Sequence, residues 1–387
     1  MSKKQRKLKI AINATYNPSG GSRTQLINMI KNFTMMDDID IVVFIRKRNI
    51  DLIKNIKSQN CKIIISRFAG VSRFTRILWE QTILPFLIRN KVDVLFCPGN
   101  IAPIFSPVKS VVWIGTIGPF IKSFLKYFFL QEKFELYINK FIMIASARSA
   151  TAVIFESRFT EKLFIESYRI KPTKSHVINI GKDVCFKIVS SEIDKELHND
   201  YGNYEPFALC VSHLYPYKNI IRMLKAIKKS IDETGVKINL LIAGSRISKS
   251  YDNRINKCIE KLCIQKNVTL LGAISKESLQ YLYSNCEFLI FPSPFENFAY
   301  TLVEAMSCGT PIICSNTTAM PETCKDAAIY FDPYDTEEMS EQISQFLNNE
   351  KLRNTYREKS IARANELPDF EDVTLQTLDI IKNLVNE

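Results

Sequence analysis

Residues 288–316 have the sequence FLIFPSPFENFAYTLVEAMSCGTPIICSN. Its first four residues are apolar and are bounded by prolines, which predicts a short buried strand. Residues 299–307 carry apolar side chains at helical spacing, and Gly309 followed by Pro311 is a typical helix end. Because the apolar residues 312–314 follow, the stretch predicts a strand–helix–strand unit of a parallel sheet.

Two carboxylates, Glu296 and Glu304, flank the start of the predicted helix. One lies in the loop after the first strand and the other about one turn into the helix, so both are expected to line the crevice where open parallel sheets bind ligands. The backbone amides of Asn297, Phe298 and Ala299 would open the helix and could face an anion. Glutamate is a common residue, so the spacing of these two carboxylates by itself is weak evidence for a ligand site. The residues around them decide whether they belong to one.

The segment FPSPFENFAYTLVEAMSCGTPII resembles the signature of the retaining, nucleotide-sugar-dependent glycosyltransferases of family 4, also called group 1. The resemblance implies the α/β GT-B fold, in which two Rossmann-like doubly wound domains face each other across a cleft. It also implies that Glu296 contacts the donor sugar and Glu304 the ribose of the nucleotide. The family usually has glycine at the positions of Asn297 and Ala299, where side chains would narrow the approach to the donor phosphate.

The second domain begins with a predicted strand at residues 207–211, followed by SHLYPYKN. This loop resembles the diphosphate loop of the family, in which a lysine at the position of Lys218 neutralises the donor phosphates. His213 stands where many members have arginine, and a histidine is mostly neutral at pH 7. Lys218 is therefore expected to act in catalysis together with Glu296, and His213 to contribute to donor binding.

The first domain begins with a predicted strand at residues 8–14, followed by Gly20 and Gly21. A glycine pair here is either a plain turn or a loop whose amides approach a phosphate. The resemblance favours a donor-facing loop. No G-x-G-x-x-G or Walker A motif occurs, which disfavours a dehydrogenase or P-loop NTPase. Gly115 and Thr116 stand where many family members carry a His-Asp pair, so no histidine base is expected there.

Alternating strands and helices along the chain predict parallel sheets with helices on both faces. The amphipathic pattern of the last segment predicts a helix, and the resemblance implies that it crosses back to the first domain. The predicted domains are residues 1–187 on the acceptor side, a polar linker at 188–204, the nucleotide-sugar-binding domain at 205–369 and the C-terminal helix at 370–387.

Charge is unevenly distributed along the chain. Through Ser190 there are 31 Lys and Arg against 12 Asp and Glu, about +19, which leaves 21 against 28, about −7, for the rest. This asymmetry indicates a polyanionic partner for the first half, either an anionic membrane surface or a nucleic acid. Residues 120–144 mix aromatic residues with lysines and predict either an interfacial membrane helix or a domain helix with one buried face. No nucleic-acid-binding motif is present, so nucleic acid is disfavoured.

Composition restricts the location and the chemistry. The apolar run after the basic start is interrupted by Asn13, and no uncharged apolar stretch reaches the ~18 residues that a membrane span needs. The ten cysteines form no C-x-x-C pairs and lie apart from the three histidines, which predicts reduced thiols in the cytoplasm and no metal site.

These features predict a retaining transferase that moves a sugar from a nucleotide diphosphate sugar to a hydroxyl of a glycan acceptor, without a metal or other cofactor. The charge and the habits of the family suggest a lipid-linked acceptor for bacterial surface polysaccharide, reached from the cytoplasm or the inner face of the plasma membrane. The alternative is a non-catalytic nucleotide-sugar-binding protein, motivated by the departures at Gly115, Thr116, Asn297 and Ala299.

Overall fold

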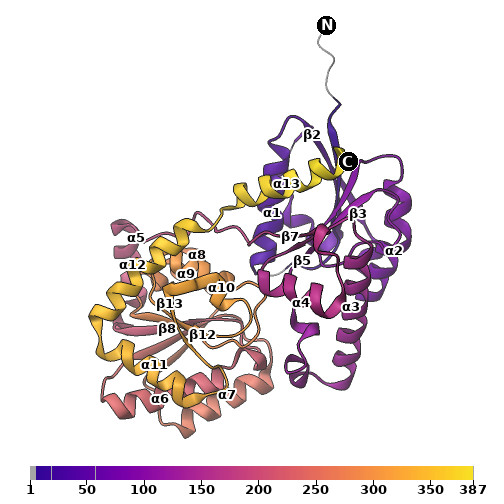
Figure 1. Cartoon of the computed structure of the whole chain (residues 1–387). Helices are drawn as coiled ribbons and strands as arrows, with labels where there is room; N and C mark the ends of the chain where they lie inside the picture. The colour runs from indigo at the N-terminus through magenta and orange to yellow at the C-terminus, as the bar shows by residue number, and fades with distance from the viewer. Residues whose placement is uncertain (1–5, 19, 57, 387) are drawn as a thin grey trace. The chain divides into compact units, whose positions relative to one another are not determined.

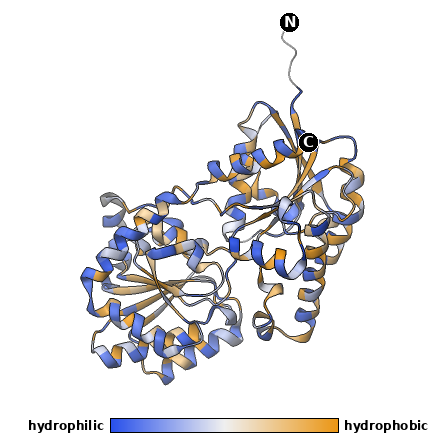
Figure 2. Ribbon diagram, in the orientation of Figure 1, coloured by the Kyte–Doolittle hydropathy of each residue, from blue (hydrophilic) through white to orange (hydrophobic). Residues whose placement is uncertain are grey.

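A computed structural model describes residues 6–18, 20–56 and 58–386 of the chain. The chain divides into two compact units. The N-terminal unit comprises residues 1–181 together with 368–387, and the C-terminal unit comprises residues 182–367. Each unit is built around one parallel sheet, and in each the strands are coloured mainly hydrophobic (Figure 2).

The N-terminal unit contains a seven-stranded parallel sheet in the order β3-β2-β1-β4-β5-β6-β7. Successive residues of β1 pack into different apolar clusters, Ile10 and Ile12 on one face and Ala11 on the other. Burial on both faces explains why residues 94–97 and 152–155, inside the sheet, are continuous apolar runs. The strands are β1 (Leu8–Ala14), β2 (Ile39–Arg46), β3 (Cys61–Ser66), β4 (Val94–Cys97), β5 (Lys109–Ile114), β6 (Ala152–Phe155) and β7 (Ser175–Val177). The helices are α1 (Gly21–Thr34), α2 (Arg73–Ile88), α3 (Leu130–Ser149) and α4 (Arg158–Tyr168).

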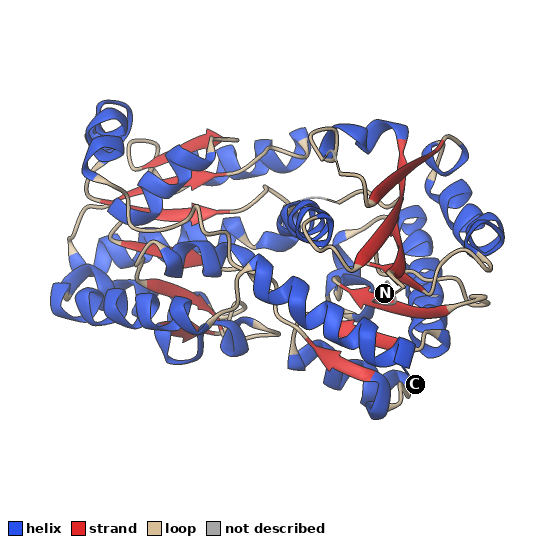
Figure 3. Ribbon diagram, turned by 90° about the horizontal axis from the view of Figure 1, so that it is seen from above, coloured by secondary structure: helices blue, strands red, loops and turns tan. Residues whose placement is uncertain are grey.

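The C-terminal unit contains a six-stranded parallel sheet in the order β10-β9-β8-β11-β12-β13, between helices (Figure 3). The strands are β8 (Phe207–Val211), β9 (Asn239–Ala243), β10 (Val268–Gly272), β11 (Phe288–Phe291), β12 (Ile312–Ser315) and β13 (Ala328–Phe331). The helices are α5 (Ser191–Tyr201), α6 (Ile220–Thr234), α7 (Lys249–Lys261), α8 (Lys276–Asn285), α9 (Tyr300–Ser307), α10 (Met320–Cys324), α11 (Thr336–Asn348) and α12 (Glu350–Glu366). In both sheets the strand order reverses next to the first strand of the unit, at β1/β4 and at β8/β11.

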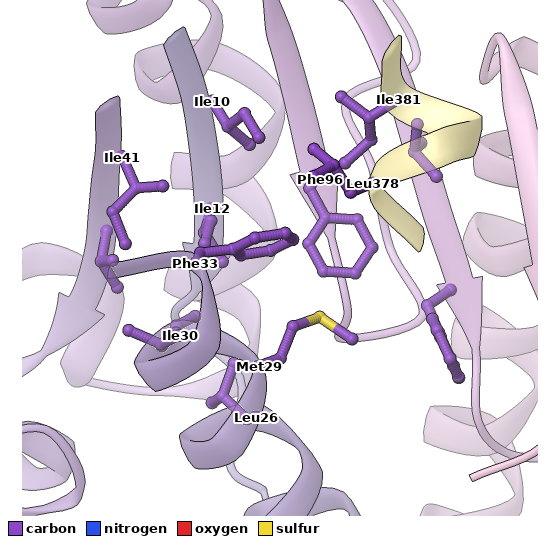
Figure 4. Packing of buried hydrophobic residues seen from close by; sticks show 14 of the residues in the cluster. Ile10, Ile12, Leu26, Met29, Ile30, Phe33, Ile41, Phe96, Leu378 and Ile381 are labelled. Carbon is purple, nitrogen blue, oxygen red and sulfur yellow. The ribbon is translucent and has the colours of Figure 1, made fainter. Parts of the chain in front are cut away.

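The last helix, α13 (Phe370–Asn386), belongs to the N-terminal unit, as expected (Figure 1). Its buried Leu378 and Ile381 lie in the same cluster as Phe33 of α1 and Phe96 of β4 (Figure 4). Polar contacts add to this packing, because Asn32 Nδ2 donates a hydrogen bond to the carbonyl oxygen of Phe370 at 3.2 Å. The final helix therefore completes the core of the first domain.

Two local expectations are wrong. Residues 120–144 are not one helix, because short 3₁₀ turns occupy residues 118–120 and 124–127 and α3 begins only at Leu130. The predicted linker 188–204 contains helix α5, which contacts α8 and belongs to the C-terminal unit. The units divide after Gly181, six residues before the predicted domain end at 187. Over the described residues, no helix is both long and apolar enough to span a membrane.

Candidate functional site

Residues 288–316 form β11, a loop, α9 and β12. Asn297, Phe298 and Ala299 are buried in the loop that leads into α9, and Ala299 is the residue before its first turn. Ala299 has φ −83°, and neither it nor Asn297 has a positive φ. The two departures from glycine therefore introduce no backbone strain. Gly309 follows the end of helix α9 and has a φ of 72°, in the left-handed region that glycine adopts easily.

Lys218 and Glu296 form an ion pair, with Nζ 2.5 Å from Oε1 and both side chains about five-sixths buried. Lys218 ends a 3₁₀ turn after β8, and Glu296 lies in the loop after β11. Because β8 and β11 are hydrogen-bonded neighbours, their carboxyl ends bring the two loops together. The charge pair thus occupies the point where the strand order of the C-terminal sheet reverses, which is where open α/β sheets bind ligands.

Asn219, a residue that the sequence analysis did not single out, holds the Lys218 loop in place. Its φ of 64° is in the left-handed region, which asparagine tolerates better than most residues. Its buried Nδ2 donates hydrogen bonds to the carbonyl oxygens of Pro292 at 3.2 Å and Pro333 at 2.7 Å. Arg222 Nη1 in turn donates to Asn219 Oδ1 at 2.7 Å. The signal for this role was the asparagine directly after the lysine, at the start of a helix.

His213 lies in the same loop. Its Nδ1 accepts a hydrogen bond from the backbone amide of Ser245 at 3.3 Å. Burial and the positive charge of Lys218 both lower the pKa of His213. The imidazole is therefore neutral at pH 7 with its proton on Nε2, which is left as a donor. Gly244 is required beside it, because a Cβ at this position would overlap the carbonyl oxygen of Ser212.

Glu304 lies on α9, with a different set of neighbours from Glu296. Its Oε2 accepts a hydrogen bond from the hydroxyl of buried Tyr283 at 3.2 Å. Burial raises the pKa of Glu304 to about 7, against the lowering influence of the Tyr283 hydrogen bond and of Lys276. Lys276 itself pairs with Asp183 at 2.6 Å. Tyr283, Lys276 and Asp183 were missed by sequence reasoning, since they are distant in sequence and belong to no recognisable motif.

The predicted glycine loop belongs to the N-terminal unit. Gly20 has φ 53° and precedes α1, whose first residue is Gly21. Gly115 follows β5, and its backbone amide donates to Asn100 Oδ1 at 2.6 Å. A Cβ at position 115 would lie only 2.7 Å from Oε1 of buried Glu156, which also accepts a hydrogen bond from Trp113 Nε1 at 3.0 Å. A larger residue at position 115 would therefore require the Glu156 carboxylate to move from its place beside Trp113.

Within the described residues, no group of three or more His, Cys, Asp or Glu is arranged to hold a metal ion. All ten cysteines are free thiols. The C-terminal site offers the ammonium of Lys218, the carboxylates of Glu296 and Glu304, the neutral imidazole of His213 and the backbone at the start of α9. This combination can bind a phosphate group beside hydroxyl-bearing sugars.

Residues 194–363 match the family model described as glycosyl transferases group 1. The O-antigen chain mannosyltransferase B of Escherichia coli is 32% identical over 181 residues, which are 47% of this chain and 47% of that protein. The N-acetylgalactosamine-N,N'-diacetylbacillosaminyl-diphospho-undecaprenol 4-alpha-N-acetylgalactosaminyltransferase of Campylobacter jejuni is 22% identical over 239 residues, 61% of each chain. The match thus spans about half to three-fifths of these relatives.

Similarity to solved structures extends over nearly the whole chain. The crystal structure of Anabaena HepE in complex with UDP and glucose aligns with a TM-score of 0.74 and 17% identity, and covers 97% of this chain and 100% of that one. At this identity the likeness establishes the fold. Residues 194–363 thus resemble the group 1 glycosyltransferases, and the shared architecture over nearly the whole chain shows the GT-B fold of two Rossmann-like units.

Proposed function

We propose that this protein transfers a sugar from a nucleotide diphosphate sugar to a hydroxyl of a glycan acceptor, with retention at the anomeric carbon. The observation that carries the proposal is the Lys218–Glu296 pair at the strand-order reversal of the C-terminal sheet, next to the helix that bears Glu304. Support comes from the relatives that are named mannosyltransferase and N-acetylgalactosaminyltransferase, and from the neighbour that holds UDP and glucose.

In this proposal Lys218 neutralises the leaving diphosphate, and the backbone at the start of α9 near Phe298 assists it. Glu296 accepts hydrogen bonds from hydroxyls of the donor sugar, while Glu304 holds the ribose. His213 donates a hydrogen bond to the diphosphate through Nε2, and the loop of Gly20 and Gly21 approaches the donor. The oxygen of the donor phosphate takes the proton of the attacking hydroxyl on the same face of the sugar, so no protein nucleophile is needed.

We propose further that the reaction needs no metal, because Lys218 supplies the positive charge that a cation would otherwise provide. Transfer activity that survives EDTA after removal of divalent ions from all solutions supports this view. Activity that EDTA abolishes and Mg²⁺ or Mn²⁺ restores contradicts it.

The acceptor that we propose is a lipid-linked glycan, used in the synthesis of a bacterial surface polysaccharide at the inner face of the plasma membrane. The Escherichia coli relative is named for the O-antigen chain, and the Campylobacter jejuni relative for a diphospho-undecaprenol substrate. Helix α3 supports membrane contact, because its exposed side chains form an apolar stripe at helical spacing. The stripe consists of Leu130, Phe134, Tyr137 and Phe141, each 54% to 85% exposed.

Basic residues beside the stripe make an anionic membrane the expected partner. Lys122 and Lys126 are exposed in the turns before α3, and Lys133 lies in its first turn. Reversing these three charges to glutamate should release the protein from vesicles of phosphatidylglycerol and phosphatidylcholine in a flotation assay. Binding that is unchanged by the reversal would contradict the membrane proposal, and binding to DNA instead would favour a nucleic-acid partner.

The donor site is tested by thermal unfolding of the wild type, Lys218→Ala and Glu304→Ala with a panel of nucleotides and nucleotide sugars. A donor present at 100 times its dissociation constant should stabilise the wild type by about 2.7 kcal/mol. We expect one nucleotide series to do so, and both variants to lose most of the effect. The absence of any stabilising nucleotide at millimolar concentration would overturn the proposed site. Stabilisation without sugar transfer to any acceptor would instead indicate a non-catalytic binding protein.

A further inference from the structure

The N-terminal unit has a cavity of its own, of about 380 Å³. It lies at the carboxyl edge of the sheet, where residues after four neighbouring strands line it: Tyr16 after β1, Arg46 at the end of β2, Asn100 after β4 and Thr116 after β5. These strands include β1 and β4, where the strand order reverses. Position and size are those of a ligand site in an open parallel sheet. None of its lining residues belongs to the C-terminal donor site.

Four arginines line this cavity. Arg46 ends β2, Arg48 lies in the 3₁₀ turn that follows, and Arg73 and Arg76 stand in the first turn of α2. Two of them have an acidic neighbour: Arg73 lies 3.5 Å from exposed Glu135, and Arg76 Nε lies 3.7 Å from buried Glu80. In the described part of the chain, no ion pair within 4.0 Å joins Arg46 or Arg48 to a carboxylate. The lining therefore carries a surplus of positive charge.

Arg46 is the unusual member of the group, because its side chain is buried and only 4% of the residue is exposed. Among the described residues, its Nε and Nη2 have no hydrogen-bond partner. Burial, and the positive charges of Arg48 and Arg76, lower the pKa of Arg46 to about 10 against the raising influence of Glu80, so it still carries its charge at pH 7. A buried guanidinium is ordinarily paired and hydrogen-bonded, since desolvation of an unpaired charge is costly. The guanidinium of Arg46 thus lies beside the cavity with two nitrogens that have no partner among the described residues.

We propose that this arginine cavity binds a phosphate or diphosphate group of the acceptor substrate. The inference rests on the proposed transferase function and assigns the phosphate group of the acceptor to this cavity of the N-terminal unit. A guanidinium presents a planar fork of donors that matches phosphate oxygens, and several around one cavity suit a multiply charged group. A dianion in the cavity would compensate the charge of buried Arg46 and offset the repulsion among the four arginines.

The rim of the cavity suits an acceptor whose phosphate is attached to an apolar chain. Val71 lines the cavity and is 75% exposed, and Phe74, one residue beyond Arg73 at the start of α2, is equally exposed. Asn139 and Met143 of α3 also line it, so the helix that bears the exposed aromatic stripe forms one wall. Anion donors inside and apolar side chains at the mouth fit a phosphorylated amphiphile.

The test measures binding of inorganic pyrophosphate to the full-length protein by isothermal titration calorimetry, in the Lys218→Ala background to remove the donor-site cation. Arg46→Met and Arg48→Gln should each weaken binding, Arg46→Met by roughly 10- to 100-fold, because hydrogen bonds to a charged group are lost. Arg89→Met is the matched control, since Arg89 is exposed at the end of α2 and away from the cavity. Arg48 is exposed, so its variant folds whatever the effect of the Arg46 substitution.

Pyrophosphate that fails to bind in the Lys218→Ala background overturns the proposal, as does equal weakening by Arg89→Met, which would indicate general charge attraction. A second arm compares pyrophosphate with farnesyl diphosphate in the same background. Tighter binding of farnesyl diphosphate that Arg46→Met reduces identifies a lipid-linked phosphate as the source, and equal affinities identify a water-soluble phosphorylated acceptor. Failure of the donor-site proposal is seen separately, because the nucleotide panel reports on Lys218 and Glu304 and leaves the arginine cavity unchanged.

Discussion

The two sheets differ in whether the buried cation at the carboxyl edge is paired with a carboxylate. In the C-terminal unit the ammonium of Lys218 lies 2.5 Å from a carboxylate, and the pair neutralises itself without a ligand. In the N-terminal unit Arg46 is more deeply buried, yet two of its nitrogens have no partner among the described residues. Pairing holds the cation in place at little cost to the stability of the ligand-free fold. A ligand must then replace the carboxylate as the partner of that cation. An unpaired site is costly to the ligand-free fold and gains more when an anion binds.

The first consequence concerns catalysis, where the expected effect is largest. Lys218→Ala should lower kcat/KM for sugar transfer by roughly 100- to 1000-fold, about 2.7 to 4 kcal/mol of transition-state stabilisation, because the leaving diphosphate loses its counter-charge. Lys218→Arg should restore only part of the activity, since the longer planar group does not reproduce a compact point charge beside Glu296. Steady-state kinetics with the donor identified by the nucleotide panel provides the measurement.

Lys228→Ala is the matched control for this prediction, because Lys228 lies on α6 and pairs with Asp232 at the surface. Exposed pairs of this kind contribute little. Equal losses in Lys218→Ala and Lys228→Ala, or full activity in Lys218→Ala, would remove Lys218 from the reaction.

The second prediction concerns the free energy of unfolding and compares the removal of the buried cation at each of the two sheet edges. Arg46→Met should raise the free energy of unfolding by about 1 to 3 kcal/mol, because an apolar chain of similar length replaces an unpaired buried charge. Lys218→Ala should lower it by about 1 kcal/mol, since Glu296 then loses its partner. Urea unfolding of both variants without ligand gives both values. Destabilisation by Arg46→Met would show that the guanidinium is satisfied in solution, and the contrast between the edges would fail.

Much of the fold could be predicted from the sequence because the parallel strands are buried on both faces. β1, β8 and β11 have the predicted bounds, because their mostly apolar residues indicate a buried strand without information from distant segments. The segment around α3 was wrong for the opposite reason. Its aromatic residues and lysines recur at helical spacing, yet residues 118–120 and 124–127 form 3₁₀ turns and the helix begins at Leu130. Helical spacing alone did not reveal this boundary.

The residues of the candidate site likewise include some that could be named from the sequence and others that could not. Lys218, Glu296 and Glu304 could be named because they lie in motifs of adjacent residues. Tyr283, Asn219 and the arginine cavity depend on contacts between segments far apart in the chain, such as the carbonyl of Pro333 that accepts a hydrogen bond from Asn219. The excess of basic residues before Ser190 did indicate an anionic partner. It could not indicate that Arg46 is buried at the end of a strand, beside the first turn of α2.

The third prediction has the smallest expected effect and concerns Glu304, the ionisable group on α9 whose burial raises its pKa to about 7 from 4.5. Between these two pH values the folded protein holds a proton that the unfolded chain has released, so the free energy of unfolding falls as the pH rises from 4.5 to 7. Glu304→Gln removes this penalty. It should stabilise the protein by at most about 3 kcal/mol at pH 8 and by almost nothing at pH 4.5.

Thermal unfolding of Glu304→Gln and wild type across pH 4.5 to 8 measures this difference, with Glu341→Gln on the exposed face of α11 as the background variant. A gap between Glu304→Gln and wild type that is constant with pH would show that Glu304 titrates equally in the folded and unfolded states. A gap that widens with pH and closes when the donor nucleotide is added would tie the buried carboxyl to the ligand. The ribose hydroxyls would then donate hydrogen bonds to the ionised carboxylate in addition to the one that the Tyr283 hydroxyl donates in the free protein.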